Sequence, residues 1–271
     1  ESGSESLVPF LNEHKDELQA DTCIVCDTSM WDQDTPAITS RLRGLVYIEA
    51  TLHGPTHDLH SGGYGGALVN PANALTKILG QLHDSDGRVQ IEGFYDDVTE
   101  VSAEQVSQWN SLGDADALLL ESSGSKAVFG ETGYGTLERL WARPTCDING
   151  LRAGYIGEGA KTVIGATAMA KISCRLVAHQ NPEAIEKALF AFLENRTPVG
   201  CHWEIKSFGS APAIAVPTES PWLSAASSAL SHIFPNPTVL IGTGGSIPVV
   251  GEFQKILGVD AVMVGFSLDD D

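Results

Sequence analysis

The chain has 271 residues, of which 42% are hydrophobic and 19% are charged, and this composition indicates one large or two ordinary globular domains. Its formal net charge of −19 would repel phosphate backbones and anionic lipids, so we expect neither a nucleic-acid partner nor a membrane partner. No apolar stretch approaches the ~20 residues of a membrane span, and the chain starts without the basic residues of a secretory signal, so we expect a cytoplasmic protein.

The first predicted elements are a helix over 5–19, with Ser4 as its N-cap, and a strand over the apolar segment 22–26. Within that strand, Cys23 and Cys26 have the C-x-x-C spacing of many zinc sites. No second pair follows at zinc-ribbon distance, so we expect two buried strand thiols. The chain has five cysteines in all, and an odd, scattered set indicates free thiols rather than a disulfide framework.

A half-buried strand and a capped helix come next. Apolar and polar residues alternate over 44–52, as in a strand with one buried face. After a Gly-rich loop, Asn70 and Pro71 open a helix with an apolar inner side, and the turn over 84–87 ends it.

The middle of the chain repeats this pattern after a less regular stretch. Residues 89–91 predict a short strand, and Ser102 opens a helix with a glutamine in capping-box position. Alternation over 168–176 predicts a long half-buried strand, followed by a helix that Asn-Pro opens at 181–182 and by a strand over 202–207. One-sided strands and two helices indicate a mostly antiparallel sheet covered by helices, which is an α+β arrangement.

The last part of the chain has a different pattern. Ser220 and Pro221 open a helix, 238–241 is a fully apolar strand, 246–257 is helical, and 261–265 is again fully apolar. Apolar runs that alternate with helices indicate a parallel sheet buried on both faces.

We therefore expect an α/β fold in which residues 1–42 and 215–271 form part of a parallel-sheet domain and residues 43–214 form an inserted α+β domain. In open parallel sheets, ligands gather beyond the carboxyl ends of the strands. Asp27 follows the first of these strands, a GTGGS loop ending at Ser246 follows the second, and a run with three aspartates follows the third. Taken alone, Asp27 also suits a turn, and the loop lacks the lysine of a P-loop and also suits a tight turn.

The Gly-rich loop carries three histidines, His53, His57 and His60, within eight positions. They could bind a metal, donate to a developing oxyanion, or be incidental residues of a turn. Arg175 lies on the polar face of the strand over 168–176, either as a solvated side chain or as a clamp for a carboxylate. Spacing alone leaves these alternatives open.

Several motifs, in order across nearly the whole chain, resemble those of two-zinc peptidases related to carnosinase and acetylornithine deacetylase. The motifs are ESGSE, Cys26-Asp27, RGLVYIEA, HDLHSGGYGG with Asn70-Pro71, GxKTVI, SCRLVAH and GGSIPVV. The resemblance implies a catalytic domain that holds two zinc ions, or manganese or cobalt in their place, and an inserted lid domain through which two subunits form a homodimer.

The resemblance also implies metal ligands. Asp27 corresponds to a carboxylate ligand of one zinc, and Glu1 corresponds to the ligand of the other. In the family the general base directly precedes the position of Glu1, and further ligands lie upstream of it and shortly after the position of Asp271. We therefore expect the chain to be a fragment with an incomplete metal centre, in which the final aspartates shape a turn.

The substrate contacts implied by the resemblance come mostly from the lid. His60 corresponds to a histidine that enters the partner subunit's active site and stabilises the tetrahedral oxyanion. Thr162 and Arg175 correspond to substrate-binding residues that lid closure brings onto the substrate, with Arg175 gripping its carboxylate. Ser246 corresponds to a residue that binds the same carboxylate from the catalytic side. The other two histidines match no functional position and stay as loop residues.

The sequence thus predicts a hydrolase that splits the amide bond of a dipeptide or similar small substrate with a metal-activated water. One alternative is an N-acyl amino acid deacylase of the acetylornithine or succinyl-diaminopimelate type, which shares the ligands and the lid. The other is a catalytically silent dimerisation module.

Overall fold

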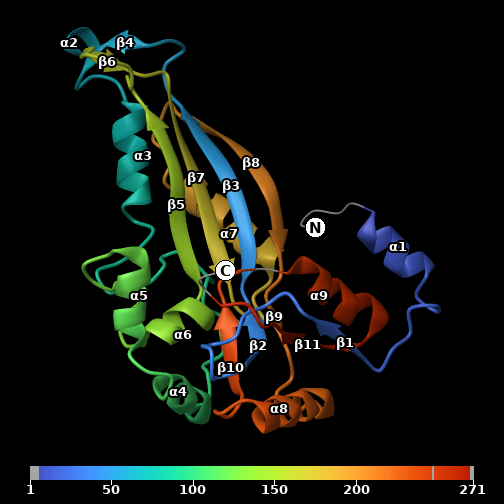
Figure 1. Cartoon of the computed structure of the whole chain (residues 1–271). Helices are drawn as coiled ribbons and strands as arrows, with labels where there is room; N and C mark the ends of the chain where they lie inside the picture. Colours follow the sequence, from blue (N-terminus) through green and yellow to red (C-terminus); the bar gives the residue numbers. More distant parts are fainter. Residues whose placement is uncertain (1–5, 246, 269–271) are drawn as a thin grey trace.

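The computed structural model describes residues 6–245 and 247–268, and these form an elongated molecule with two main sheets (Figure 1). A long sheet with two helices, the lid, comprises residues 44–100 and 143–211. It rises from the base, which comprises residues 6–43 and the described residues after 211. The prediction of an α/β fold with an α+β lid is confirmed.

The lid sheet contains four antiparallel strands in the order β5 (Thr145–Ala153), β7 (Thr167–Leu176), β3 (Gly44–His53) and β8 (His202–Ala211). β3 and β7 pair along their whole length, over ten residues of each strand. The alternation predicted for β3 is confirmed, since every second residue from Val46 to Leu52 is fully buried. The edge strand β5 was not predicted, because its side chains are mostly exposed and show no apolar alternation.

Two helices, α3 (Pro71–Leu79) and α7 (Pro182–Glu194), cover one face of this sheet. Both predicted caps are confirmed: Asn70 accepts a hydrogen bond from the N–H of Ala72, and Asn181 accepts one from the N–H of Glu183, each at 2.9 Å. The inner side chains of these helices join the buried strand residues in one core; they are Leu75, Ile78, Leu79, Ile185, Leu189, Phe192 and Leu193.

The base contains a second sheet, which is mixed rather than parallel as predicted. Its order is β1 (Thr22–Val25), β11 (Asp260–Val264), β2 (Ala37–Leu42) and β10 (Val239–Thr243), with β9 (Ile214–Ala215) paired to β2. β1 is parallel to β11 and β10 is parallel to β2, but β11 and β2 are antiparallel. β2 was not predicted, because the fully buried Thr39 and Ser40 interrupt its apolar pattern.

The helices of the base are α1 (Leu7–Glu13), α8 (Pro221–Ile233), α9 (Pro248–Glu252) and a π-helical turn over Phe253–Leu257. α8 begins after Ser220, as predicted. The predicted cap of the first helix, Ser4, lies outside the described residues. Among the helices that the structure describes, none has the length and apolar character needed to cross a bilayer.

Three short helices lie between α3 and β5 in the chain: α4 (Ala103–Asn110), α5 (Ala115–Ser123) and α6 (Thr136–Trp141). Ser102 caps α4 as predicted, with its hydroxyl accepting from the N–H of Gln105 at 3.2 Å. The strand predicted over 89–91 is wrong, since only one of its residues joins an isolated bridge. α4 and α6 pack on β10 of the base, where the Trp109 indole donates to the carbonyl of Leu240 at 2.8 Å.

A buried carboxylate holds this segment in place. Glu131 is only 8% exposed, and it accepts two hydrogen bonds from Arg143, at 2.8 and 2.9 Å, and one from Arg88 at 2.9 Å. Arg143 also donates to Glu100 at 3.1 Å. Each buried charge of this group is therefore matched by an opposite one.

All five cysteines are free thiols, as predicted. Cys146 and Cys174 are buried opposite each other on β5 and β7, and their hydrogen bond and burial raise the pKa of Cys174. The prediction that Cys23 and Cys26 are both buried is wrong. Cys23 is half-buried and Cys26 is exposed, because β1 lies at the edge of its sheet.

Two of the connections between the lid and the base touch each other, and together they form the junction. The chain leaves the base from Leu42 to Gly44 and returns from Ala211 to Ile214. A Cβ on Gly44 would lie 2.6 Å from the carbonyl oxygen of Ala211, so only glycine fits between the two backbones.

The cap of α3 can be tested by substitution. Asn70→Ala is expected to lower the free energy of unfolding by about 1 kcal/mol, because alanine cannot accept a hydrogen bond from the first turn. Asn73→Ala, at an exposed position of the same helix, is the control and should change it by less than ~0.5 kcal/mol. Denaturant unfolding followed by circular dichroism measures both, and equal effects would contradict the capping role.

Candidate functional site

Two of the predicted site residues lie together at the tip of the lid, which comprises residues 54–66 and 154–166 (Figure 1). Here the short strands pair with His60 opposite Val163. This register places Nε2 of His60 3.2 Å from Oγ1 of Thr162. The elements of the tip are β4 (Leu59–His60), α2 (Ser61–Tyr64) and β6 (Val163–Ile164).

The backbone determines which nitrogen of His60 carries the proton. The N–H of Gly62 donates to Nδ1 at 3.0 Å, so Nδ1 is the unprotonated nitrogen of the neutral ring. The proton then lies on Nε2, which faces the hydroxyl of Thr162. An exposed imidazole with its proton on Nε2 can donate to an oxyanion that develops on a bound substrate.

Arg175 lies at the other end of the lid. It is opposite Leu45 near the base end of β7, eight positions after Thr167, the first residue of that strand. At roughly 3.3 Å per residue, these eight positions span about 26 Å. The structure therefore brings His60 and Thr162 together and does not bring Arg175 to them. The lid of one chain cannot place both Thr162 and Arg175 on one small substrate.

A second arginine, Arg43, lies beside Arg175; it is the first residue of the RGLVYIEA motif, and no role was predicted for it. Arg43 is two positions before Leu45, the partner of Arg175, so both arginines project from the same face. The N–H of Arg43 donates to the carbonyl of Thr243 at 3.3 Å. Its Nη2 packs on Gly244, where a Cβ would lie only 2.7 Å from that nitrogen.

The electrostatic environment of Arg43 is unfavourable for a cation. Burial lowers the pKa of Arg43, the charge of Arg175 lowers this pKa further, and Asp147 acts in the opposite direction. The buried Nε of Arg43 has no hydrogen-bond partner among the described residues. Two neighbouring guanidinium groups with an unused donor can bind an anion.

The predicted metal ligand Asp27 follows β1 in the base and is exposed. β1 and β11 are parallel, so their carboxyl ends emerge at the same edge, and Gly265 packs so closely on Thr28 that no Cβ would fit there. Across residues 6–245 and 247–268, no group of three His, Cys, Asp or Glu side chains could hold a metal. Asp27 alone does not make a zinc site, which takes about four ligands. The other predicted ligand, Glu1, lies outside the described residues.

The carboxyl end of β10, which leads into the GTGGS loop, does not join the ends of β1 and β11, so the predicted convergence of all three strand ends is wrong. β2 separates β10 from β11 and is antiparallel to β11, so β10 runs in the opposite direction to β11. The loop over 242–245 therefore leaves another edge of the sheet and packs on Arg43 at the junction. The predicted substrate contact that follows this loop, Ser246, lies outside the described residues.

The other two histidines of the Gly-rich segment have local contacts. His53 is the last residue of β3 rather than a loop residue as predicted. Its ring stacks on that of His202 at a centroid distance of 4.9 Å, and its Nε2 lies 3.2 Å from Glu204. His57 forms a hydrogen bond with Thr56 at 3.1 Å. These contacts account for both side chains without a metal.

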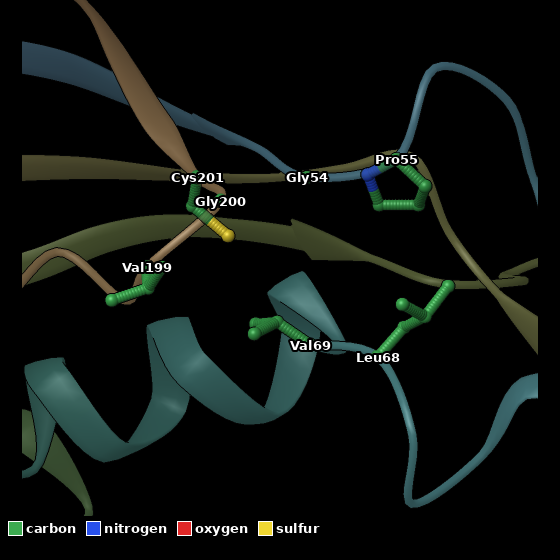
Figure 2. Close-up of a pocket in the computed structure, with 7 residues that line it drawn as sticks. All are labelled: Gly54, Pro55, Leu68, Val69, Val199, Gly200 and Cys201. Atoms are coloured by element: carbon green, nitrogen blue, oxygen red, sulfur yellow. The ribbon is translucent and has the colours of Figure 1, made fainter.

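A hollow near the tip has a mostly apolar lining. Figure 2 shows its apolar lining, which includes Leu68, Val69 and Val199. Its one ionisable side chain is Cys201, and burial raises the pKa of this thiol. A raised pKa disfavours the reactive thiolate, so this hollow is not a candidate catalytic site.

The chain matches known proteins over its whole length. A family model described as the peptidase dimerisation domain matches residues 41–201. The chain is 30% identical to the Beta-Ala-His dipeptidase of Homo sapiens, over 100% of this chain and 54% of that protein. It is 28% identical to a Cys-Gly metallodipeptidase of Candida albicans, over 93% of this chain and 53% of that protein. The chain thus spans about half the length of these curated relatives.

Solved structures give the same result. Human carnosine dipeptidase 1 matches with a TM-score of 0.81 at 27% identity, over 100% of this chain and 57% of that chain. A metallo-carboxypeptidase from Sulfolobus solfataricus matches with a TM-score of 0.83 at 30% identity, over 97% of this chain and 68% of that chain.

The position of the His60 proton can be measured by nitrogen NMR. We expect a single neutral tautomer with the proton on Nε2. In Gly62→Ala, the new Cβ would lie 2.9 Å from Cε1 of His60, so the ring should move and both tautomers should appear. Gly63→Ala is the control, since its Cβ would have no neighbour within 4 Å. A mixture of tautomers in the parent chain would contradict the assignment.

Proposed function

The chain belongs to the peptidase dimerisation domain family, and we propose that the whole protein is a metal-dependent dipeptidase that acts as a homodimer. The names of the relatives support dipeptides as substrates, since two of these proteins are a Beta-Ala-His dipeptidase and a Cys-Gly metallodipeptidase. The same names favour a dipeptidase over an N-acyl amino acid deacylase.

The main support for this proposal is the distance between the predicted substrate-binding residues of one chain. His60 and Thr162 lie at the tip, whereas Arg175 lies about 26 Å away along β7, estimated from the strand rise. A dipeptide is much shorter than this distance. We therefore infer that each active site combines the base and Arg175 of one subunit with His60 and Thr162 of its partner.

In this arrangement the chain's own residues bind and polarise the substrate. Arg175 binds the substrate carboxylate through the two parallel N–H groups of its guanidinium. Nε2–H of the partner subunit's His60 donates to the oxygen of the scissile carbonyl as its negative charge develops. The hydroxyl of Thr162, 3.2 Å from Nε2, accepts the hydrogen bond from this N–H until the substrate oxygen replaces it.

Asp27 is the described residue that would help to hold the metal. Its exposed carboxylate forms no hydrogen bond within residues 6–245 and 247–268, so it is available as a ligand. We propose zinc, with Glu1 as a further ligand. A bound zinc pair would supply an activated water as the nucleophile.

The lid offers an edge for dimer formation. β5 is the outer strand of the lid sheet, so the hydrogen-bonding groups along its free side are available to another strand (Figure 1). Ile148 and Leu151 on this strand are 46% and 54% exposed. Apolar side chains on an open sheet edge favour pairing with a second copy of the chain.

A mixing experiment in the whole protein tests the shared site. His60→Ala and Arg175→Met homodimers should each lose at least about 100-fold in turnover. After equal amounts are mixed and subunits exchange, half of the dimers should be mixed, and each of these should have one intact site. Activity should therefore recover to about a quarter of the parent value.

The recovery distinguishes a shared site from a site within one subunit. If His60 acted on its own subunit's substrate, every site in the mixture would lack one residue and activity would stay at the level of the single variants. Metal content, measured in both homodimers, should equal that of the parent, because neither residue is a proposed ligand.

The metal role of Asp27 is tested by Asp27→Asn in the whole protein. We expect the variant to lose most of its bound metal and its activity, because a neutral amide is a weaker ligand than a carboxylate. Asp21→Asn, an exposed aspartate just before β1, is the matched control and should retain both. Elemental analysis of the purified proteins gives the answer, and full metal content in Asp27→Asn would contradict the assignment.

A further inference from the structure

Two half-buried arginines near the junction lack the partners that the buried Arg143 has. The chain contains 35 acidic and 16 basic residues, so acidic partners are abundant. Arg143 is paired with Glu131 at 2.8 Å. Within the described part of the chain, the side chains of Arg43 and Arg175 form neither an ion pair nor a hydrogen bond. The charge of Asp147 acts on Arg43 from nearby, but Asp147 forms neither contact with it.

The position of Arg43 connects the two segments predicted to bind the substrate carboxylate. On one side it faces Arg175, close enough for the two charges to interact. On the other side its Nη2 lies against Gly244, in the loop that leads to Ser246. Arg43 thus lies between the lid residue and the base loop that were predicted to hold one carboxylate.

We propose that Arg43 is a further substrate-binding residue, whose guanidinium joins that of Arg175 in one site for the α-carboxylate of a peptide. The inference rests on the proposed function, since it takes Arg175 as the carboxylate anchor. The Nε of Arg43 is a donor without a partner among the described residues, and an anion between the two guanidinium groups would offset the repulsion between their like charges.

The glycine at position 244 is part of this site. A side chain there would occupy the space of Nη2 and push Arg43 away from the loop. Arginine suits the position better than lysine, because a planar guanidinium can donate two parallel hydrogen bonds to a carboxylate and lysine cannot.

The test uses the 271-residue chain with acetate as the probe. The midpoint of thermal unfolding is followed while acetate replaces chloride at constant ionic strength, which yields an apparent dissociation constant. We expect acetate to stabilise the parent chain, and Arg43→Gln and Arg43→Lys to weaken its apparent affinity about tenfold. Gly244→Ala should have a similar effect without removing a charge. Arg152→Gln, an exposed arginine on β5, is the control and should bind acetate like the parent.

The outcomes separate this inference from the proposed function. An unchanged response in Arg43→Gln, with the response lost in Arg175→Gln, would overturn the role of Arg43 and leave the proposed function intact. If acetate stabilised both Arg43→Gln and Arg175→Gln as it stabilises the parent, Arg175 would not bind the carboxylate either. No response in the parent chain, or stabilisation by inorganic phosphate but not by acetate, would overturn the carboxylate site itself. If Arg43→Gln does not fold, the apparent affinities of Arg43→Lys and Gly244→Ala for acetate test the role of Arg43 in its place.

Discussion

The continuous pairing of β3 with β7 is the constraint on which the proposed site depends. Ten residues of each strand are paired without a bulge, so the ladder fixes the distance between its two ends. His60 and Thr162 are attached at one end, and Arg43 and Arg175 are attached at the other. A single subunit therefore holds the two halves of the proposed site apart, and under this proposal two subunits must associate to bind a small substrate from both sides.

The charged groups of the molecule follow two different patterns. Around Glu131, two arginines and a carboxylate satisfy one another in the interior, as expected of a group whose role is to hold a segment in place. Around Arg43, two cations lie close together, and the nearby Asp147 forms no ion pair with Arg43, although acids outnumber basic residues two to one. Leaving cations unmatched lowers stability, so this arrangement fits a group whose partner arrives from outside.

The sequence predicted the elements whose residues carry a strong local pattern. β3, β7 and the helices opened by Asn70 and Asn181 follow from alternation and from capping, which act over a few residues. β2 and β5 were missed because one buries polar side chains and the other exposes apolar ones. The direction of β10 and the proposed role of Arg43 depend on how distant segments pair, and the local residue pattern does not show how they pair. Separate roles for His60 and Thr162 were predicted from family motifs, whereas the contact between the two residues appears only in the structure.

The backbone contact at Gly44 has a mechanical consequence. Because the two connections of the junction touch there, the lid cannot bend through one of them alone, and any swing must turn both together. The lid sheet then acts as a lever about ten residues long, or roughly 33 Å, so a rotation of about 5° at the junction would move the tip by about 3 Å. That displacement is comparable to the length of a hydrogen bond. In the proposed dimer, the accuracy with which His60 reaches a carbonyl in the opposite subunit would then depend on the stiffness of the contact at Gly44, at the far end of the lever.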